Sequence, residues 1–218
     1  MDAPAPTIPA LASHATSTRG TYLGRTPDER AADRRGRLMQ AALELFAARS
    51  YEDVTVADVC SHAKVAKRYF YEHFTDRSAL LVAVQKERND WLLAGLEAAA
   101  PRHPATLRAL LSPMMTALAT MLAADPRSAR IIYLSAPQME PHRREVIRED
   151  ARRFSAFIST ALQRHPRDPL RHHRAVVALA AGLSEVIIEW LDDGMPDDAR
   201  ALADHLTGIA TALLTPFL

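Results

Sequence analysis

The sequence predicts an all-α protein with a small N-terminal helical domain, a larger C-terminal helical domain and about nine helices. No stretch keeps a strict apolar–polar alternation between turn signals, so strands are not expected. The chain holds only 7 glycines in 218 residues, fewer than a loop-rich β protein needs. Prolines and Asp-Pro pairs divide the C-terminal part into segments of helical length.

The composition is typical of a globular protein. Apolar residues make up 48% and the formal net charge is +1, so any affinity for nucleic acid must come from a local patch. The single cysteine, Cys60, excludes an internal disulfide, and its apolar setting favours an inert thiol over a nucleophile. No apolar run approaches the ~18 residues of a membrane span. The N-terminus does not have the pattern of a signal peptide. We therefore expect a cytoplasmic protein with no membrane partner.

Residues 1–30 are rich in Pro, Ala, Ser and Thr, which predicts a flexible tail. Arginines gather near its end, and two interpretations of Arg19 and Arg25 stay open. They are either solvated side chains leading into the first helix or an arm that touches DNA phosphates or the minor groove. Beyond the tail, we expect one domain at residues 31–80 and a second at residues 81–218.

Two helices are predicted at the start of the first domain. An apolar face recurs at i, i+4, i+7 and i+8 and predicts a helix over about residues 33–48. Thr55, with Asp58 three residues later, has the pattern of a capping box that starts a second helix. That helix spans about two turns, so it must pack on its neighbours. The inward residues are Leu38, Ala42, Leu45 and Phe46 in the first helix, and Val56, Val59, Cys60 and Ala63 in the second.

Residues 62–74, HAKVAKRYFYEHF, combine clustered aromatic rings with cations. Ala66, Phe70 and Phe74 recur at every fourth position of a short third helix and are expected to face inward. The cations and tyrosines then lie on other faces, where Arg and Lys can donate to guanine and tyrosine can contact a thymine methyl or a phosphate. Two short helices joined by a tight turn form a helix-turn-helix. The alternative is a short surface helix that only closes a bundle.

Residues 35–81 resemble the DNA-binding domain of the tetracycline-repressor (TetR) family of bacterial transcription regulators. The shared positions are Ala41, Ala42, Leu45 and Phe46; Thr55, Val56, Asp58 and Val59; and Tyr71, His73, Phe74, Arg77, Leu80 and Leu81. The resemblance implies phosphate contacts by Thr55, Tyr71, His73 and Arg77, and base-reading positions at Lys67, Arg68 and Tyr69. Helix N-termini and side-chain hydroxyls suit phosphates, which agrees with these roles.

The chain departs from the family pattern in the turn and the third helix. Lys64 replaces the usual turn glycine, so a positive φ there is expected to cost strain. Ala66 replaces the usual serine cap, which forgoes about 1 kcal/mol of capping. Lys67, Arg68 and Tyr69 are bulkier and more basic than the common pattern. These departures concern the operator sequence rather than DNA binding itself.

The last two predicted helices, over about residues 168–194 and 196–218, carry more apolar surface than one subunit is expected to cover. We therefore predict a two-fold homodimer that joins them in a four-helix bundle, as the resemblance also implies, and palindromic half-sites follow from that symmetry. The alternative is a core wholly internal to the subunit. The residues predicted at the interface are Leu179, Leu183, Val186, Leu202, Leu206, Ile209 and Leu213.

A pocket for a small-molecule effector is predicted among the middle helices. Large apolar residues gather there, and methionines adapt to varied ligands, although the same residues also serve as ordinary core filler. The family usually binds an inducer in this region. Glu185 and Glu189 are either polar anchors or dimer contacts. The predicted pocket residues are Met114, Met115, Met121, Tyr133, Met139, Phe154, Phe157 and Trp190.

The resemblance implies a DNA-binding transcriptional regulator, and we expect a repressor released from a palindromic operator by a small, largely apolar inducer. An activator or a member without a ligand is the alternative, followed by a helical interaction module. An enzyme is not expected, because the sequence has no G-x-S-x-G, phosphate-binding glycine loop or H-E-x-x-H. His172 and His173 are adjacent, so they point to different helix faces, and no metal site or cofactor is predicted.

Overall fold

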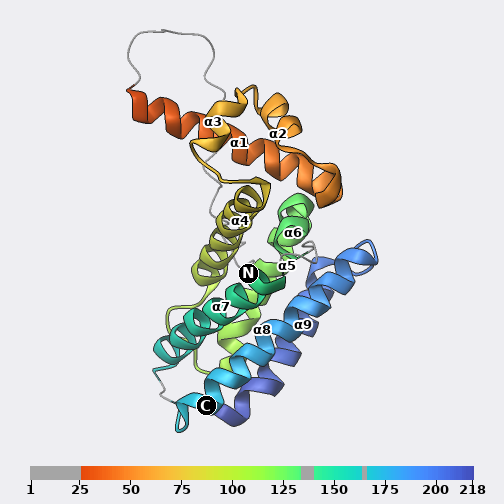
Figure 1. The fold of residues 1–218 in the computed structure, drawn as a ribbon. Helices are drawn as coiled ribbons and strands as arrows, with labels where there is room; N and C mark the ends of the chain where they lie inside the picture. The colour runs from red at the N-terminus through yellow and green to blue at the C-terminus, as the bar shows by residue number, and fades with distance from the viewer. Residues whose placement is uncertain (1–25, 134–139, 164–165) are drawn as a thin grey trace. The chain divides into compact units, whose positions relative to one another are not determined.

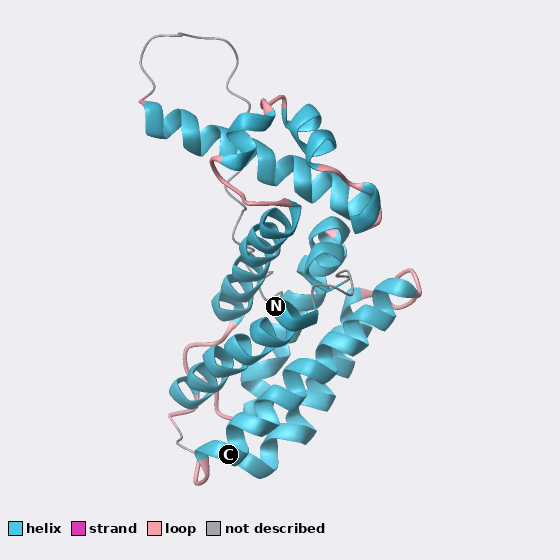
Figure 2. Ribbon diagram, in the orientation of Figure 1, coloured by secondary structure: helices cyan, strands magenta, loops and turns pink. Residues whose placement is uncertain are grey.

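The computed structural model describes residues 26–133, 140–163 and 166–218, and all regular structure within these ranges is helical (Figure 2). The all-α prediction is confirmed. The chain divides into two compact units between Asp90 and Trp91, and each unit is described by itself (Figure 1). The long helix α4 (Arg77–Ala99) begins in the first unit and ends in the second.

The N-terminal unit contains the three predicted helices and the start of α4. Helix α1 (Pro27–Ala48) packs against both α2 (Val56–Ala63) and α3 (Lys67–Tyr71). A 3-10 turn, η1 (Tyr51–Asp53), joins α1 to α2. Each helix contributes apolar side chains to a small buried core, so the two-turn helix α2 and the shorter α3 are held by tertiary contacts. The core includes Leu38, Ala42, Leu45, Val54, Val59, Phe70, Phe74 and Leu80.

Helix α1 begins at Pro27, earlier than the predicted start near residue 33. Thr26 caps it: the Thr26 hydroxyl accepts from the Glu29 backbone N–H at 3.1 Å, and the Glu29 carboxylate accepts from the Thr26 N–H at 2.7 Å. Proline at the first helical position already has a helical φ. Arg30 is therefore helical, whereas Arg19 and Arg25 lie outside the described residues.

The C-terminal unit is a bundle of long helices that pack in pairs. Helix α5 packs along α9, and α7 packs along α8, which also contacts α6 and α9 (Figure 1). Asp168 and Asp198 cap α8 and α9 by accepting from backbone N–H groups of the first turns. The bounds are α5 (Leu107–Ala124), α6 (Pro126–Tyr133), α7 (Glu140–Ala161), α8 (Pro169–Asp192), α9 (Ala199–Leu214) and a 3-10 turn η3 (Thr215–Phe217).

Helix α5 forms the centre of this unit. Within the described residues it is the one helix whose length and composition would suffice to cross a membrane, where the sequence had led us to expect none. Leu110, Leu111 and Met114 are each fully buried against neighbouring helices, as in the core helix of a water-soluble bundle. Pro113 lies inside the helix without ending it.

Most residues predicted for a dimer interface are buried within the single subunit. Leu179, Leu183, Leu202 and Leu206 are at most 9% exposed, because α6 and α7 pack against α8, α5 packs against α9, and α8 and α9 pack on each other. The other three predicted residues, Val186, Ile209 and Leu213, are half-buried against the same core. The outer faces of the two helices carry the small residues Ala178, Gly182, Gly208 and Ala212.

Candidate nucleic-acid interface

The start of α2 is fixed by a reciprocal cap, as predicted. The Thr55 hydroxyl accepts from the Asp58 N–H at 3.1 Å and donates to the Asp58 carboxylate at 2.6 Å. That carboxylate also accepts from the Thr55 N–H at 2.9 Å. These two hydrogen bonds from Thr55, and then the charge of Arg49, lower the pKa of Asp58 below its ordinary value. The anion also complements the positive end of the helix dipole.

The turn between α2 and α3 places a lysine in the left-handed conformation. Lys64 has φ 53° and ψ 44°. Its N–H donates to the Ser61 carbonyl at 3.2 Å, and the Val65 N–H donates to the Cys60 carbonyl at 3.0 Å. This is the hydrogen-bond pattern of a Schellman motif, whose left-handed position is usually glycine. The positive φ expected at Lys64 is therefore present.

Helix α3 and the residues just after it carry two buried and two more exposed aromatic rings. Phe70 is fully buried and Phe74 is 5% exposed, whereas Tyr71 is 54% exposed and Tyr69 is half-buried. Ala66 does not face inward as expected, because it is the N-cap residue of α3 and is exposed, without a side-chain cap. The buried rings anchor the helix, so the cations beside them can stay in solvent.

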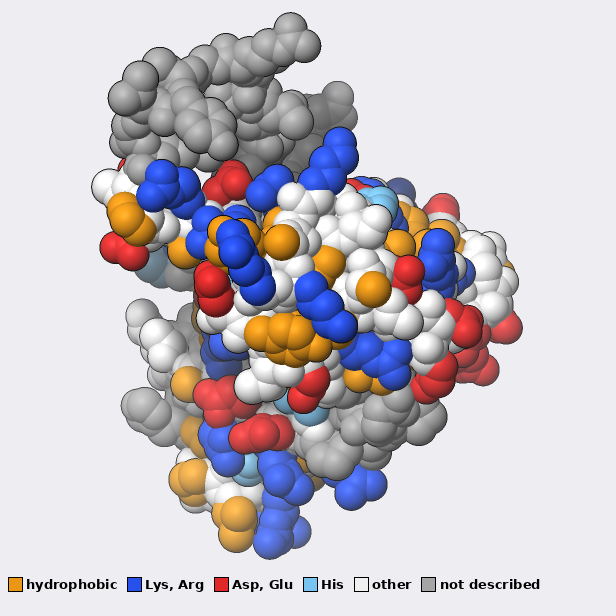
Figure 3. Space-filling model, turned by 45° about the horizontal axis from the view of Figure 1, so that its top comes forward, with side chains coloured by type: hydrophobic (Ala, Val, Ile, Leu, Met, Phe, Trp, Pro, Cys, Tyr) orange, Lys and Arg blue, Asp and Glu red, His pale blue; other side chains and the backbone are white. Residues whose placement is uncertain are grey.

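The outer face of α3 presents Lys67 and Arg68 to solvent. Arg68 is not extended: its Nη2 donates to the Tyr69 hydroxyl at 2.6 Å, and its guanidinium carbon lies 4.5 Å from the Tyr69 ring centroid. Figure 3 shows Lys and Arg side chains interspersed with hydrophobic ones on the surface nearest the viewer. This combination of exposed cations and tyrosines on a short helix suits a DNA groove.

Arg77, at the start of α4, has a structural role that the sequence did not predict. Its Nη1 donates to the carbonyls of Tyr51, Glu52 and Val54 at 2.8, 3.2 and 2.7 Å. Its guanidinium carbon lies 4.1 Å from the Tyr51 ring centroid. The side chain therefore ties α4 to the segment before α2, and Nη1 is already engaged by protein acceptors.

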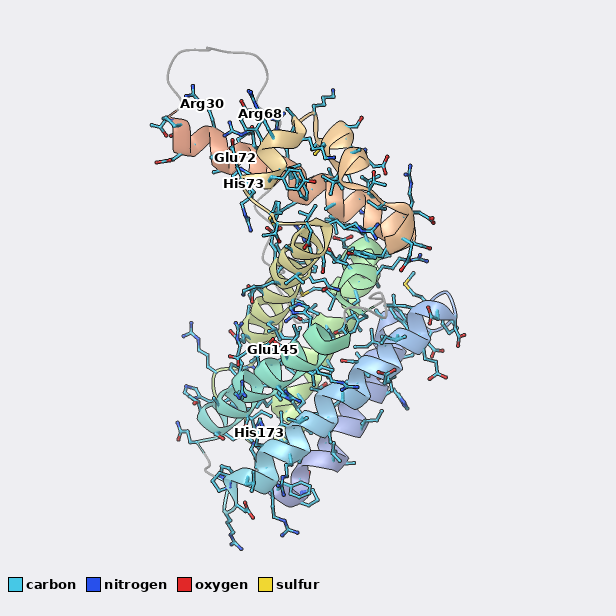
Figure 4. All side chains as sticks on the ribbon, in the orientation of Figure 1. Arg30, Arg68, Glu72, His73, Glu145 and His173 are labelled. Carbon is cyan, nitrogen blue, oxygen red and sulfur yellow. The ribbon has the colours of Figure 1, made fainter. Side chains whose placement is uncertain are left out.

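The other predicted phosphate contacts differ in their surroundings. Tyr71 is exposed on α3. His73 is half-buried, and its Nε2 is buried without a hydrogen-bond partner, so the ring must turn before that atom can reach a phosphate. The Thr55 hydroxyl proton already serves Asp58. Figure 4 labels His73 beside the end of α3, with Arg68 and Glu72.

Residues 38–84 match the family model of the bacterial regulatory proteins of the tetR family. This segment therefore has the sequence pattern of the TetR-family DNA-binding domain. The matched residues include all of α2 and α3 and parts of α1 and α4, so they contain the helix-turn-helix described above. TetR-family proteins are transcriptional regulators, which confirms the prediction that the chain is not an enzyme.

Individual proteins that are similar to the chain in sequence or in fold include transcriptional regulators. The chain is 26% identical over 170 residues to the HTH-type transcriptional activator FasR of Mycolicibacterium smegmatis, covering 76% of each. A tetR-family regulator from Streptomyces coelicolor is similar in fold, with a TM-score of 0.67, 20% identity and coverage of 85% of this chain and 82% of that one. FadR from Bacillus subtilis in complex with stearoyl-CoA gives a TM-score of 0.63 at 16% identity, covering 84% of this chain and 99% of FadR.

The predicted effector residues lie in one packed core of the C-terminal unit. Met114, Met115 and Met121 are at most 2% exposed, and Trp190 is 5% exposed. The remaining described members, Tyr133, Phe154 and Phe157, pack half-buried against that core. Burial, and then the charge of Asp150, raise the pKa of the Tyr133 hydroxyl above its ordinary value, so it stays neutral. Met139 lies outside the described residues.

A cleft of about 390 Å³ lies between α7 and α8, and none of the predicted effector residues is among those that line it. It is lined by Arg152, Ser155, Ala156, Ser159, Pro166, Pro169, His172 and His173. His172 is 1% exposed, and neither ring nitrogen has a hydrogen-bond partner. Burial lowers its pKa, the Phe217 backbone opposes this shift, and the charge of His173 acts in the same direction as burial. His172 is therefore a neutral core histidine.

Proposed function

We propose that this TetR-family regulator is a cytoplasmic repressor that binds a palindromic operator as a homodimer and is released by a small, largely apolar effector. The outer face of α3 is the observation that carries the proposal. Phe70 and Phe74 anchor the helix from below, and Lys67 and Arg68 stay exposed on the other side. A helix with buried rings on one side and exposed cations on the other can enter the major groove while its buried side stays packed.

The proposed base-reading residues are Lys67, Arg68 and Tyr69. Arg and Lys donate to the O6 and N7 of guanine, and a tyrosine ring can pack on a thymine methyl. Phosphate contacts are proposed for Thr55, Tyr71, His73 and Arg77, with two conditions set by the geometry. Arg77 has to use nitrogens other than Nη1, and the His73 ring has to turn. These contacts would position the helix but carry no sequence information.

Dimerisation is proposed through the outer faces of α8 and α9. The small residues there allow close helix approach, although they do not define an interface by themselves. A two-fold dimer presents two copies of α3, and half-sites then lie about one helical turn of DNA apart.

The effector is proposed to insert among the methionines and aromatic residues of the C-terminal core. Methionine side chains are flexible, so they can repack around a ligand with little strain. The similar FadR of Bacillus subtilis is seen with stearoyl-CoA, which makes a long acyl chain the first ligand class to test here. Release from DNA then requires that the effector bind the DNA-incompetent state more tightly than the competent one.

Activation is the second candidate, because the curated relative FasR is a transcriptional activator. The same contacts with DNA serve either role. A reporter with the selected operator placed upstream of, and then overlapping, the promoter separates them: expression rises with the protein for an activator and falls for a repressor.

Selection of bound duplexes from a random pool tests DNA recognition directly. We expect a palindromic consensus, and the affinity of Arg68→Ala for that operator should fall by ~1–3 kcal/mol while its affinity for scrambled DNA changes little. His73→Ala should weaken both duplexes similarly. Lys86→Ala, on an exposed lysine paired with Asp90, is the control and should bind as the parent does. A chain that stays monomeric and binds no duplex at low salt would refute the proposal.

A further inference from the structure

The recognition helix α3 is too short to hold its own shape. It contains five residues, Lys67–Tyr71, and its N-cap residue Ala66 provides no side-chain hydrogen bond. Helices of this length are not stable in isolation. Phe70 and Phe74 fasten its inner side by burial. The outer side carries the residues proposed to read DNA, so their orientation depends on other contacts.

Arg34, in the second turn of α1, makes contacts with this outer side. Its guanidinium carbon lies 4.3 Å from the centroid of the Tyr69 ring. Its Nη2 lies 3.7 Å from the carboxylate of Glu72, just after α3. The Arg34 side chain is 21% exposed, and its Nε is buried without a hydrogen-bond partner. A guanidinium that lies over a ring at this distance is making a cation–π contact.

Tyr69 in turn holds Arg68. The Arg68 Nη2 donates to the Tyr69 hydroxyl at 2.6 Å while its guanidinium lies over the same ring. An exposed arginine normally samples many rotamers, and ordering it on DNA costs side-chain entropy. Here Arg68 already contacts the Tyr69 ring, which Arg34 also contacts (Arg68 and Glu72 are labelled in Figure 4).

We propose that Arg34 is a positioning residue for DNA recognition, which stacks on Tyr69 and pairs with Glu72 so that Tyr69 and Arg68 form one preorganised reading unit. Arg34 lies before residues 38–84, the range that matches the family model. The DNA consequence rests on the proposed function. The positioning itself is a property of the free protein and can be measured without DNA.

The ion pair with Glu72 gives Arg34 a second effect on DNA binding, which can be measured separately from the effect of its contact with Tyr69. A carboxylate beside a recognition helix repels the phosphate backbone, and Arg34 offsets that charge. Loss of Arg34 therefore removes the stacking that orients Tyr69 and also leaves Glu72 unpaired. The first effect lowers discrimination between operator and scrambled DNA. The second lowers affinity for both duplexes in a salt-dependent way, and Glu72→Gln removes it.

The test compares Arg34→Met, Arg34→Lys and Arg34→Met combined with Glu72→Gln, with binding to the selected operator and to a scrambled duplex measured by fluorescence anisotropy at several salt concentrations. Arg37→Met is the matched control, because Arg37 pairs with Asp33 on its own helix at 3.3 Å. Arg34→Met should reduce the operator-to-scrambled ratio about fivefold, the factor equivalent to one cation–π contact. Adding Glu72→Gln should restore overall affinity but not the ratio.

Arg34→Lys keeps the charge beside Glu72 but lacks the planar fork, so it should recover affinity more than discrimination. Arg37→Met should leave the ratio unchanged. If Arg34→Met with Glu72→Gln weakens both duplexes equally and lowers the salt slope by about one, Arg34 is a direct phosphate contact and the proposal is overturned.

Amide hydrogen exchange in the free protein separates this inference from the proposed function. The His73 and Phe74 N–H groups both donate to the Phe70 carbonyl at 2.9 Å. Arg34→Met should speed their exchange, and Arg37→Met should not. Unchanged exchange refutes the positioning role whether or not DNA binds. Faster exchange in a protein that recognises no duplex supports the positioning role and refutes the DNA-binding proposal instead.

Discussion

Replacing Lys64 by glycine should stabilise the helix-turn-helix. Lys64 occupies the left-handed region, with φ 53° and ψ 44°. That conformation costs a residue with a Cβ about 1–2 kcal/mol. Glycine removes this cost but makes the unfolded chain more flexible, which takes back about 0.4–1 kcal/mol. The net gain should be about 0.5–1 kcal/mol, or about 2–8 °C in the melting temperature of a domain of this size.

The assay has to report on the N-terminal unit alone. Both tryptophans, Trp91 and Trp190, lie in the C-terminal unit, so tryptophan fluorescence is unsuitable. Amide hydrogen exchange in peptides covering residues 56–74 gives the free energy of opening around the turn. Lys64→Gly should slow this exchange by the factor that corresponds to the expected gain.

Lys64→Ala is the control, because alanine also has a Cβ and removes the same charge. It should give little or no gain. If Lys64→Ala stabilises the unit as much as Lys64→Gly, the effect comes from the lost charge, and the argument from backbone strain is wrong.

Three further predictions follow from other contacts. Ala66→Ser should add the missing cap to α3 and slow exchange in that helix by an amount equivalent to about 1 kcal/mol; unchanged exchange would contradict the capping argument. The buried His172 resists protonation, so between its lowered pKa and the ordinary value of about 6.5 the unfolded chain binds more protons, and stability should fall as pH drops through that window. His172→Leu should flatten this fall when unfolding of the C-terminal unit is followed by tryptophan fluorescence, and an unchanged pH profile would exclude His172 as its source. Thr55→Ala removes a hydroxyl donor from Asp58, so an NMR titration should find the Asp58 pKa raised toward its ordinary value, and an unaltered pKa would mean that the hydroxyl is not its cause.

Local chemistry made parts of the fold predictable. The Thr55–Asp58 capping box defines the start of α2 through contacts three residues apart, and a single sequence shows such a pair. The spacing of Phe70 and Phe74 likewise indicated which rings of α3 are buried. The start of α1 has an equally local signal in Thr26 and Glu29, but the sequence prediction missed it and began the helix near residue 33.

The remaining contacts join residues that are distant in the chain. Arg34 contacts Tyr69, and Arg77 donates to the carbonyls of Tyr51, Glu52 and Val54. No helical period relates residues so far apart in the chain. The burial of Leu202 shows the same limit in the C-terminal unit. Its spacing revealed an apolar face on α9, but the sequence did not show that α5 of the same subunit covers that face.

The attachment of Arg77 has a mechanical consequence. Arg77 is the first residue of α4. The carbonyls that accept its hydrogen bonds lie just before Thr55, the N-cap of α2. Arg77 therefore links the first residue of α4 directly to the segment that precedes α2. If α4 tilts, the start of α2 should move with it, because the Arg77 contacts couple the two helix starts directly.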